Sequence, residues 1–124
     1  MNFFQARVER EGESAWLTTA ALRLPLPPER ARAVDGGDVI FGIRPEDIYD
    51  PSFPRVDSNP ALVTCNVELA EPMGSETYLH LTAGEDSFVA RVDPRTKATP
   101  GESFKLAFDL THLHLFDPES ETAL

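Results

Sequence analysis

The chain has 124 residues, of which 21 are acidic against 11 Lys and Arg, and a formal net charge of −10. This length suits about one domain, and this charge repels nucleic-acid phosphates and anionic membrane surfaces, so nucleic-acid binding is disfavoured. A single cysteine allows no internal disulfide. Residues 1–5 do not resemble a secretory signal, and no apolar run reaches the roughly 18–20 residues that span a bilayer. We therefore expect a cytoplasmic protein without membrane insertion.

The beginning of the chain predicts two strands and one short helix. Residues 2–10 alternate between apolar and polar side chains, which is the period of a half-buried strand. A hairpin turn at residues 11–13 leads into a second, less regular strand over residues 16–26. The prolines at its end are tolerated only at a sheet edge or a strand end. Residues 28–34 begin with a proline followed by good helix formers, which predicts one or two helical turns.

Residues 39–47, Val-Ile-Phe-Gly-Ile-Arg-Pro-Glu-Asp, give the strongest strand signal. β-Branched and aromatic side chains suit a buried pleated surface, and Gly42 interrupts them as glycine does where a strand bends or another backbone approaches. Pro45 removes a ladder donor and holds Arg44 extended, so the strand should end there. The turn that follows, with Glu46, is then a charged candidate surface.

The second half alternates more regularly and predicts strands at residues 63–69, 78–81, 88–92, 104–110 and 112–116. Turns separate these segments, so the first three should form consecutive antiparallel strands. Short strands about ten residues apart predict an all-β fold with one short helix, arranged as a small closed or nearly closed barrel. A proline-rich loop at residues 49–60 is expected to join two halves, residues 1–48 and 61–118, of a single domain that spans residues 1–124.

The histidines are the only candidate metal ligands. His112 and His114, two apart on a predicted strand, would project to one face and could hold a metal ion together with His80. The favoured interpretation is surface or half-buried imidazoles, because no cysteine or further spaced ligand supports the pair. The sequence therefore predicts no metal site.

Catalysis is not indicated either. Four acidic residues could supply an acid and a base in a cleft: Glu71, Glu76, Asp86 and Glu102. No nucleophile and base stand at an interpretable spacing, and no phosphate-binding loop is present, so ATP hydrolysis by this chain alone is not expected. Three aromatic side chains could stack on a sugar or a base: Tyr49, Phe53 and Tyr78. A small barrel, however, needs most of its aromatic residues for its core.

Four segments resemble one known family in order and spacing. Residues 41–47 are similar to the Gly-Ile-Arg-Pro-Glu segment in the carboxy-terminal regulatory domain of ATP-binding subunits from ABC importers of the maltose and glycerol-phosphate type. Residues 1–4 resemble the start of that domain, residues 71–77 its Gly-x-Glu-Thr turn, and residues 112–119 its closing strand, in the form of the carbohydrate-importer branch. The residues that carry over, with a structural or interface role, are Gly42, Ile43, Arg44, Pro45, Glu46, Gly74, Glu76, Thr77, His114, Leu115 and Phe116.

The resemblance implies a fold and a set of partners. The implied fold is a transport-associated barrel of the oligonucleotide/oligosaccharide-binding (OB) type. The implied role is regulation and dimerisation, with a second copy of the ATP-binding subunit, the membrane subunits and a regulatory protein as partners. The full-length parent would be an ABC ATPase at the cytoplasmic face of the cell membrane. The family's ATPase domain is missing from this sequence, so its ATP and Mg sites carry over to no residue here, and this chain itself is not expected to be an enzyme or to hold a cofactor.

Two other functions stay open at this point. A free-standing barrel could bind a small sugar or an oxyanion in a groove beside the turns at residues 73–77 and 84–87. Nucleic-acid binding through aromatic stacking on the barrel face is the third candidate, and the charge of −10 disfavours it.

Overall fold

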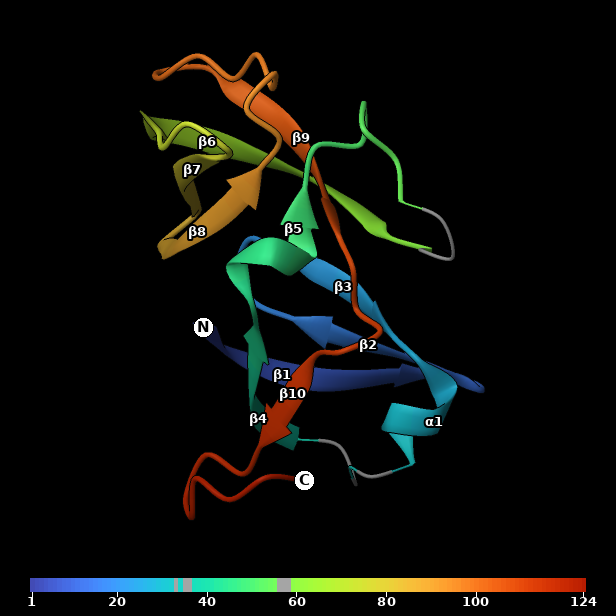
Figure 1. Cartoon of the computed structure of the whole chain (residues 1–124). Helices are drawn as coiled ribbons and strands as arrows, with labels where there is room; N and C mark the ends of the chain where they lie inside the picture. The colour runs from blue at the N-terminus through green and yellow to red at the C-terminus, as the bar shows by residue number, and fades with distance from the viewer. Residues whose placement is uncertain (33, 35–36, 56–58) are drawn as a thin grey trace.

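The computed structural model describes residues 1–32, 34, 37–55 and 59–124. They form two five-stranded antiparallel sheets, which lie one above the other in Figure 1. The first sheet contains β1 (Asn2–Glu11), β2 (Ser14–Thr18), β3 (Arg23–Leu26), β4 (Gly37–Ile43) and β10 (His114–Phe116), in the spatial order β10-β4-β1-β2-β3. The second sheet contains β5 (Ile48–Tyr49), β6 (Ala61–Pro72), β7 (Thr77–Ala83), β8 (Asp86–Val92) and β9 (Ser103–Phe108), in the order β5-β9-β6-β7-β8. The predicted all-β class is confirmed.

The chain passes between the sheets at two places (Figure 1). β4 ends at Ile43, and a single 3-10 turn, η1 (Pro45–Asp47), leads into β5. Later the chain leaves β9 and returns to the first sheet as β10. β8, one edge of the second sheet, packs beside η1 and β5, the other edge. The result is the nearly closed barrel that the sequence predicts, and the predicted strand end at Pro45 is also confirmed.

The single strand predicted over residues 16–26 is wrong, because this segment forms β2 and β3 with a turn between them. The Thr19 hydroxyl accepts hydrogen bonds from the backbone N–H groups of Ala21 and Leu22, at 3.2 and 2.9 Å, and the Thr19 N–H donates to the Leu22 carbonyl. A threonine hydroxyl can bond nearby backbone groups in this way and form a turn without Gly or Pro. Pro25 then lies in β3, an edge strand, as its missing donor requires.

The predicted short helix is present and has one turn. α1 (Pro28–Ala31) is one turn, whereas the prediction covered residues 28–34, of which residue 33 lies outside the described part of the chain. The guanidinium of Arg10 donates to the carbonyls of Ala31 and Val34, at 2.7 and 2.6 Å. Carbonyls at the end of a helix have no partner within it, so Arg10 of β1 satisfies this terminus.

Four phenylalanines connect the two sheets through the core. Phe4 of β1 stacks on Phe41 of β4, with ring centroids 4.7 Å apart, and also lies 5.3 Å from Phe88 of β8. Phe88 in turn makes an edge contact with Phe108 of β9 at 5.7 Å. All four rings are 4% exposed or less. Aromatic pairs at these distances add to the stabilisation from burial, so this chain of rings, the phenylalanine bridge, holds sheet to sheet.

A side-chain amide joins the sheets at their edge. The Asn2 Nδ2 donates to the Val89 carbonyl at 2.8 Å, and the Val89 N–H donates to the Asn2 Oδ1 at 2.9 Å. Asn2 belongs to β1 and Val89 to β8, an edge strand of the other sheet. Edge strands present unpaired backbone groups, so the Asn2 amide completes the pairing of Val89 as a neighbouring strand would.

The remaining predicted strands agree with the structure except at their ends. β6, β7 and β8 are the three consecutive antiparallel strands that were expected. β10 begins at His114, so the prediction that a strand includes His112 is wrong; the Leu113 N–H donates to the Leu110 carbonyl in a turn at this point. Tyr49, in the predicted loop, ends the two-residue strand β5, which is too short to show a period. No helix among the described residues has the length and hydrophobicity to cross a membrane.

A glycine in the turn between β7 and β8 allows a contact between the sheets. Gly84 has φ +61°, and a Cβ placed there would lie 2.7 Å from the Cβ of Ala21 in the turn between β2 and β3. Real Cβ contacts are not this close, so the missing side chain is what lets the two turns meet. Gly12 has φ +62°, and no atom of the described residues lies within 4 Å of where its Cβ would stand.

The Asn2 bridge gives a first prediction. Replacing Asn2 by Ala removes two hydrogen bonds and should lower the free energy of unfolding by about 1–3 kcal/mol, measured by urea denaturation. Gln5→Ala, on the exposed face of the same strand, is the matched control and should change stability by less than about 0.5 kcal/mol. Equal effects in the two variants would show that the Asn2 amide does not join the sheets.

The Gly84 contact gives a second prediction. Both Gly84→Ala and Gly12→Ala place a side chain at positive φ, which costs about 1–2 kcal/mol. Gly84→Ala should lose about 1–3 kcal/mol more than Gly12→Ala, because its methyl group meets Ala21. The double variant Gly84→Ala with Ala21→Gly should recover this difference in thermal unfolding. If it does not, the two turns are not in contact.

Candidate functional site

The structure brings the family-motif segments together at the junction of the two sheets. Gly42 and Ile43 end β4, and β4 pairs with β10 so that His114 lies opposite Gly42. η1 packs against β8, and β8 pairs with β7, where Thr77 lies opposite Val92. The three segments, far apart in the sequence, therefore border one region of the fold.

Some motif side chains are part of the core and others face outward. Ile43 and Leu115 are 1% exposed and Thr77 is 7% exposed. Arg44 and Gly74 are exposed, and these five are half-buried: Pro45, Glu46, Glu76, His114 and Phe116. Gly42 is buried because the Met1 side chain lies over it, with the Met1 Sδ 2.6 Å from where a Cβ would stand.

One cavity of about 320 Å³ lies where η1 meets the turn before β7. We name it the Glu46–Glu76 cavity; it is lined by Glu46, Tyr49, Asp50, Phe53, Arg55, Ser75, Glu76, Arg91, Val92, Asp93 and Pro94. Arg91 links its two acidic motif residues: its Nε lies 3.0 Å from the Glu76 Oε2, and its pKa is raised by a hydrogen bond with Tyr78 and by the charges of Glu76 and Glu46. Sequence reasoning could not place Arg91 here, because its pairing with Glu76 depends on the register of β7 and β8.

The aromatic rings of this cavity are already in contact with arginines. The guanidinium of Arg55 lies 4.2 Å from the centre of the Tyr49 ring, and that of Arg95 lies 4.4 Å from the centre of the Phe53 ring. Arg95 is held by two bonds to Asp93, at 2.9 Å each, and these bonds lower the pKa of Asp93 to about 2. Because cation–π contacts cover one face of each ring, stacking of these rings on a sugar is not favoured.

A second hollow, of about 520 Å³, lies on the other side of the β4 end. We name it the Arg44–His114 hollow; its lining residues are Arg30, Arg44, Thr111, His112, Leu113 and His114. Arg30 reaches it from α1 and donates to the Leu113 carbonyl at 2.6 Å. Arg30 stands 83 residues before Leu113, so sequence reasoning had no means of placing it here.

Carboxylates lie near this hollow without lining it. The pKa of Asp47 is raised, first by burial and then by Asp109 and Glu46, while Arg55 and His112 act in the opposite direction. The Asp109 N–H donates to the Asp47 carbonyl at 2.8 Å, which ties the connection before β10 to η1.

The three histidines that were considered as metal ligands do not come together. His112 and His114 both line the Arg44–His114 hollow, whereas His80 is on β7 and bonds to the Glu71 carboxylate. Within the described part of the chain, no three His, Cys, Asp or Glu side chains are placed to hold a metal ion. The sulfur of Cys65 is in the core, where burial raises the pKa of the thiol to about 12.

The acidic residues considered for catalysis are also separate. Glu76 lines the Glu46–Glu76 cavity, Glu71 is paired with His80, Asp86 begins β8 and Glu102 precedes β9. The two turns that would border a groove in the alternative of sugar or oxyanion binding lie at opposite ends of β7, a strand of seven residues that spans about 20 Å. That groove is therefore not favoured.

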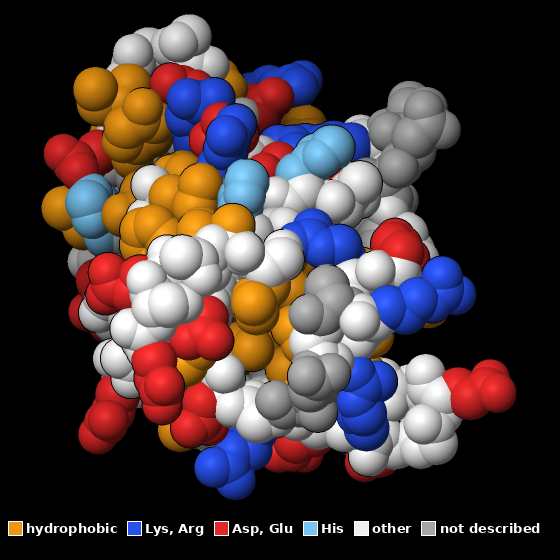
Figure 2. Space-filling view, turned by 90° about the horizontal axis from the view of Figure 1, so that it is seen from below, with side chains coloured by type: hydrophobic (Ala, Val, Ile, Leu, Met, Phe, Trp, Pro, Cys, Tyr) orange, Lys and Arg blue, Asp and Glu red, His pale blue; other side chains and the backbone are white. Residues whose placement is uncertain are grey.

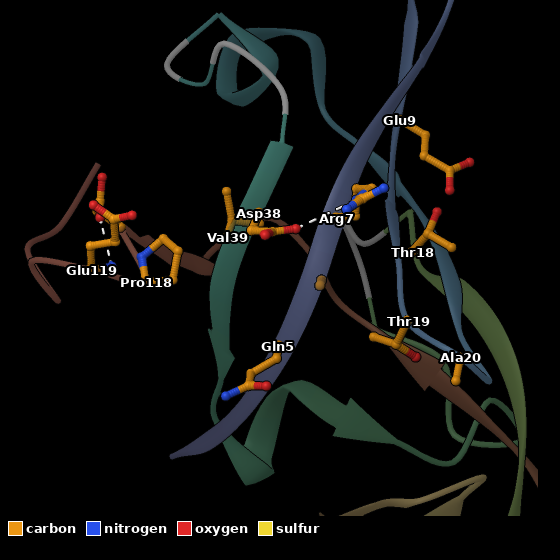
Figure 3. A pocket seen from close by; sticks show the side chains of 12 residues that line it. Gln5, Arg7, Glu9, Thr18, Thr19, Ala20, Asp38, Val39, Pro118 and Glu119 are labelled. Carbon is orange, nitrogen blue, oxygen red and sulfur yellow. Dashed lines mark hydrogen bonds and ion pairs between the residues drawn. The ribbon is translucent and has the colours of Figure 1, made fainter.

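A third hollow, of about 900 Å³, lies over the outer face of the first sheet (Figure 3). Arg7 and Asp38 form an ion pair there at 3.4 Å, with about two thirds of each side chain exposed (68% and 69%). Figure 3 shows the labelled side chains spread over β1, β2, β4 and the segments after β2 and β10, without converging on one point. A hollow of this kind positions no reacting group.

Apolar side chains gather on the outer face of the first sheet. Met1 and Phe3 are 48% and 60% exposed, and the Phe3 ring makes an edge contact with Phe116 at 6.0 Å. We call these three residues the outer apolar cluster. His114 adjoins it, with its ring stacked on that of Phe116 at 6.4 Å. Seen from below, the molecule has a hydrophobic area bordered by His and by Lys or Arg side chains (Figure 2).

Comparisons with known proteins agree with this architecture. Residues 1–48 match the MalK OB fold domain and residues 41–116 match the TOBE domain. The osmoprotective compounds uptake ATP-binding protein GgtA of Synechocystis is 38% identical over 127 residues, which are 100% of this chain and 34% of GgtA. The multiple sugar-binding transport ATP-binding protein MsmK of Streptococcus mutans is 36% identical over 127 residues, which are 100% of this chain and 33% of MsmK. The chain thus spans about a third of the length of these relatives.

A solved structure shows the same fold. The cytoplasmic molybdate-binding protein ModG, with molybdate bound, superposes with a TM-score of 0.67 at 17% identity, covering 94% of this chain and 96% of ModG. The OB-type barrel and the family inferred from the four sequence segments are confirmed. Since its model matches more than half of the residues, the chain belongs to the TOBE domain family.

Proposed function

We propose that the chain is the carboxy-terminal regulatory and dimerisation domain of the ATP-binding subunit of an ABC-type sugar importer. The observation that carries the proposal is the similarity of the whole chain to one third of two importer ATP-binding proteins. These two relatives serve different cargoes, osmoprotective compounds and multiple sugars. The part of each relative that matches this chain therefore has a role other than binding the cargo.

The proposed partners follow from this role. A second copy of the ATP-binding subunit pairs with the first, and the membrane subunits are engaged by the ATPase domain, which lies outside this chain. A regulatory protein is the remaining partner. ATP and Mg belong to the ATPase domain, so this chain does no catalysis, and the complete protein works in the cytoplasm at the inner face of the cell membrane.

The burial of several motif residues supports a structural role for them in a regulatory domain. The motif residues Ile43, Leu115 and Thr77 are buried between or beside the sheets, and their proposed role is structural. The phenylalanine bridge and the Asn2 amide hold one sheet against the other. A displacement of one sheet would therefore also move the other sheet.

The outer apolar cluster is the proposed dimer contact. Contiguous exposed apolar side chains mark interaction surfaces, whereas isolated ones are common on any protein. Phe3 contacts Phe116, and both Phe3 and Met1 lie beside Gly42. By contrast, Leu62 and Leu69, exposed on β6, are seven residues apart, a distance of about 23 Å along a strand.

Sedimentation equilibrium over a range of concentrations tests this proposal. The wild-type chain should show weak, symmetric self-association, and Phe3→Asp should weaken it roughly tenfold or more by placing a charge in the contact. Leu62→Asp is the matched control, because Leu62 is 56% exposed and lies on the other sheet. A strict monomer at high concentration would argue against dimerisation by this domain, and equal effects of both variants would argue against this face.

A further inference from the structure

The charges of the Arg-Pro-Glu motif are divided between two hollows. Glu46 lines the Glu46–Glu76 cavity with Arg91, whereas Arg44, two residues earlier, lines the Arg44–His114 hollow. Among the residues that the structure describes, none forms a hydrogen bond or ion pair with the Arg44 side chain. Within the described part of the chain, Glu46 therefore lies beside a residue of opposite charge, Arg91, whereas the Arg44 guanidinium has no such partner.

The Arg44–His114 hollow collects donors and excludes carboxylates from its lining. Arg30, Arg44, His112 and His114 supply positive or protonatable groups, and Thr111 adds a hydroxyl. This composition stands out in a chain with a net charge of −10, where acidic residues outnumber Lys and Arg by 21 to 11. Asp47, which does not line the hollow, interacts electrostatically with His112.

We propose that the Arg44–His114 hollow binds the phosphate group of a small soluble metabolite. Guanidinium groups present several N–H donors in a planar fork that matches the oxygens of phosphate. The volume of about 520 Å³ lies in the range of sites for small organic ligands, so the hollow has room for a carbon skeleton beside the phosphate. This site does not depend on the proposed role in an importer.

The walls of the hollow are held in place before any ligand binds. The bond from Arg30 to the Leu113 carbonyl fixes one guanidinium against a residue that is 1% exposed. The Thr111 N–H donates to the Asp109 Oδ1 at 3.1 Å, and the Asp109 N–H bonds to η1. A wall with a fixed backbone loses little conformational freedom on binding, which favours affinity.

Titration calorimetry on the whole chain tests the proposal with three probes: glucose 6-phosphate, inorganic phosphate and glucose. Glucose 6-phosphate should bind saturably, inorganic phosphate more weakly, and glucose not at all. Binding of both phosphates with equal affinity would overturn the metabolite part of the proposal, leaving a site for the free ion. Flat traces for all three probes would overturn it entirely.

Two variants locate the site. Arg44→Gln and His112→Gln, both exposed and without a bond to the core, should each weaken binding of glucose 6-phosphate, the former roughly tenfold. Arg7→Gln, an exposed arginine of the first sheet outside this hollow, is the matched control and should bind like wild type. Unchanged affinity in Arg44→Gln would overturn the assignment. Binding of a poly-glutamate peptide, with no binding of either phosphate, would instead assign the hollow to an acidic protein partner.

Discussion

The contact between Phe4 of β1 and Phe88 of β8 is the interaction on which the arrangement of the two sheets depends. Each sheet alone would leave one apolar face in water, and burying those faces against each other supplies the main driving force for folding. The rings on either side, Phe41 and Phe108, extend the contact into both sheets. The Asn2 amide then fixes the edge of β8 to β1, so apolar packing gives the stability and two hydrogen bonds set the relative position.

The position of the motif residues follows from this packing. Because β4 leads through η1 into the other sheet, the Arg-Pro-Glu segment lies where the sheets meet, and the proline ends the strand there. Arg44 and Glu46 consequently face different hollows, one rich in basic groups and one rich in acidic groups. Glu76 lines the Glu46–Glu76 cavity and is paired there with Arg91. His114 lines the Arg44–His114 hollow because β10 pairs with β4. A short sequence motif thus supplies two surfaces of opposite character.

Local sequence patterns were sufficient to predict most of the strands. They were not sufficient to predict features that depend on contacts between distant residues. Alternation predicted β1 and β6 to β9, β-branched and aromatic residues predicted β4, and the prolines at residues 25–28 indicated a sheet edge or a strand end, in agreement with the edge strand β3. The turn at Thr19 was missed because a hydroxyl, rather than Gly or Pro, forms it. The bonds from Arg10 to the carbonyls at and after the end of α1 could not be predicted, because Arg10 lies on another element. In the same way, Arg30 and Arg91 reach the two hollows through tertiary contacts that no spacing in the sequence reveals.

The central claim is that this chain works as one domain of a larger importer subunit, since it matches about a third of the length of its relatives. The most direct test is the size of the native gene product, measured by probing a cell extract with an antibody raised against this chain. The account predicts a band far above 13.7 kDa, close to three times that mass. A band at 13.7 kDa would contradict it, because the barrel would then act without an ATPase domain attached to it.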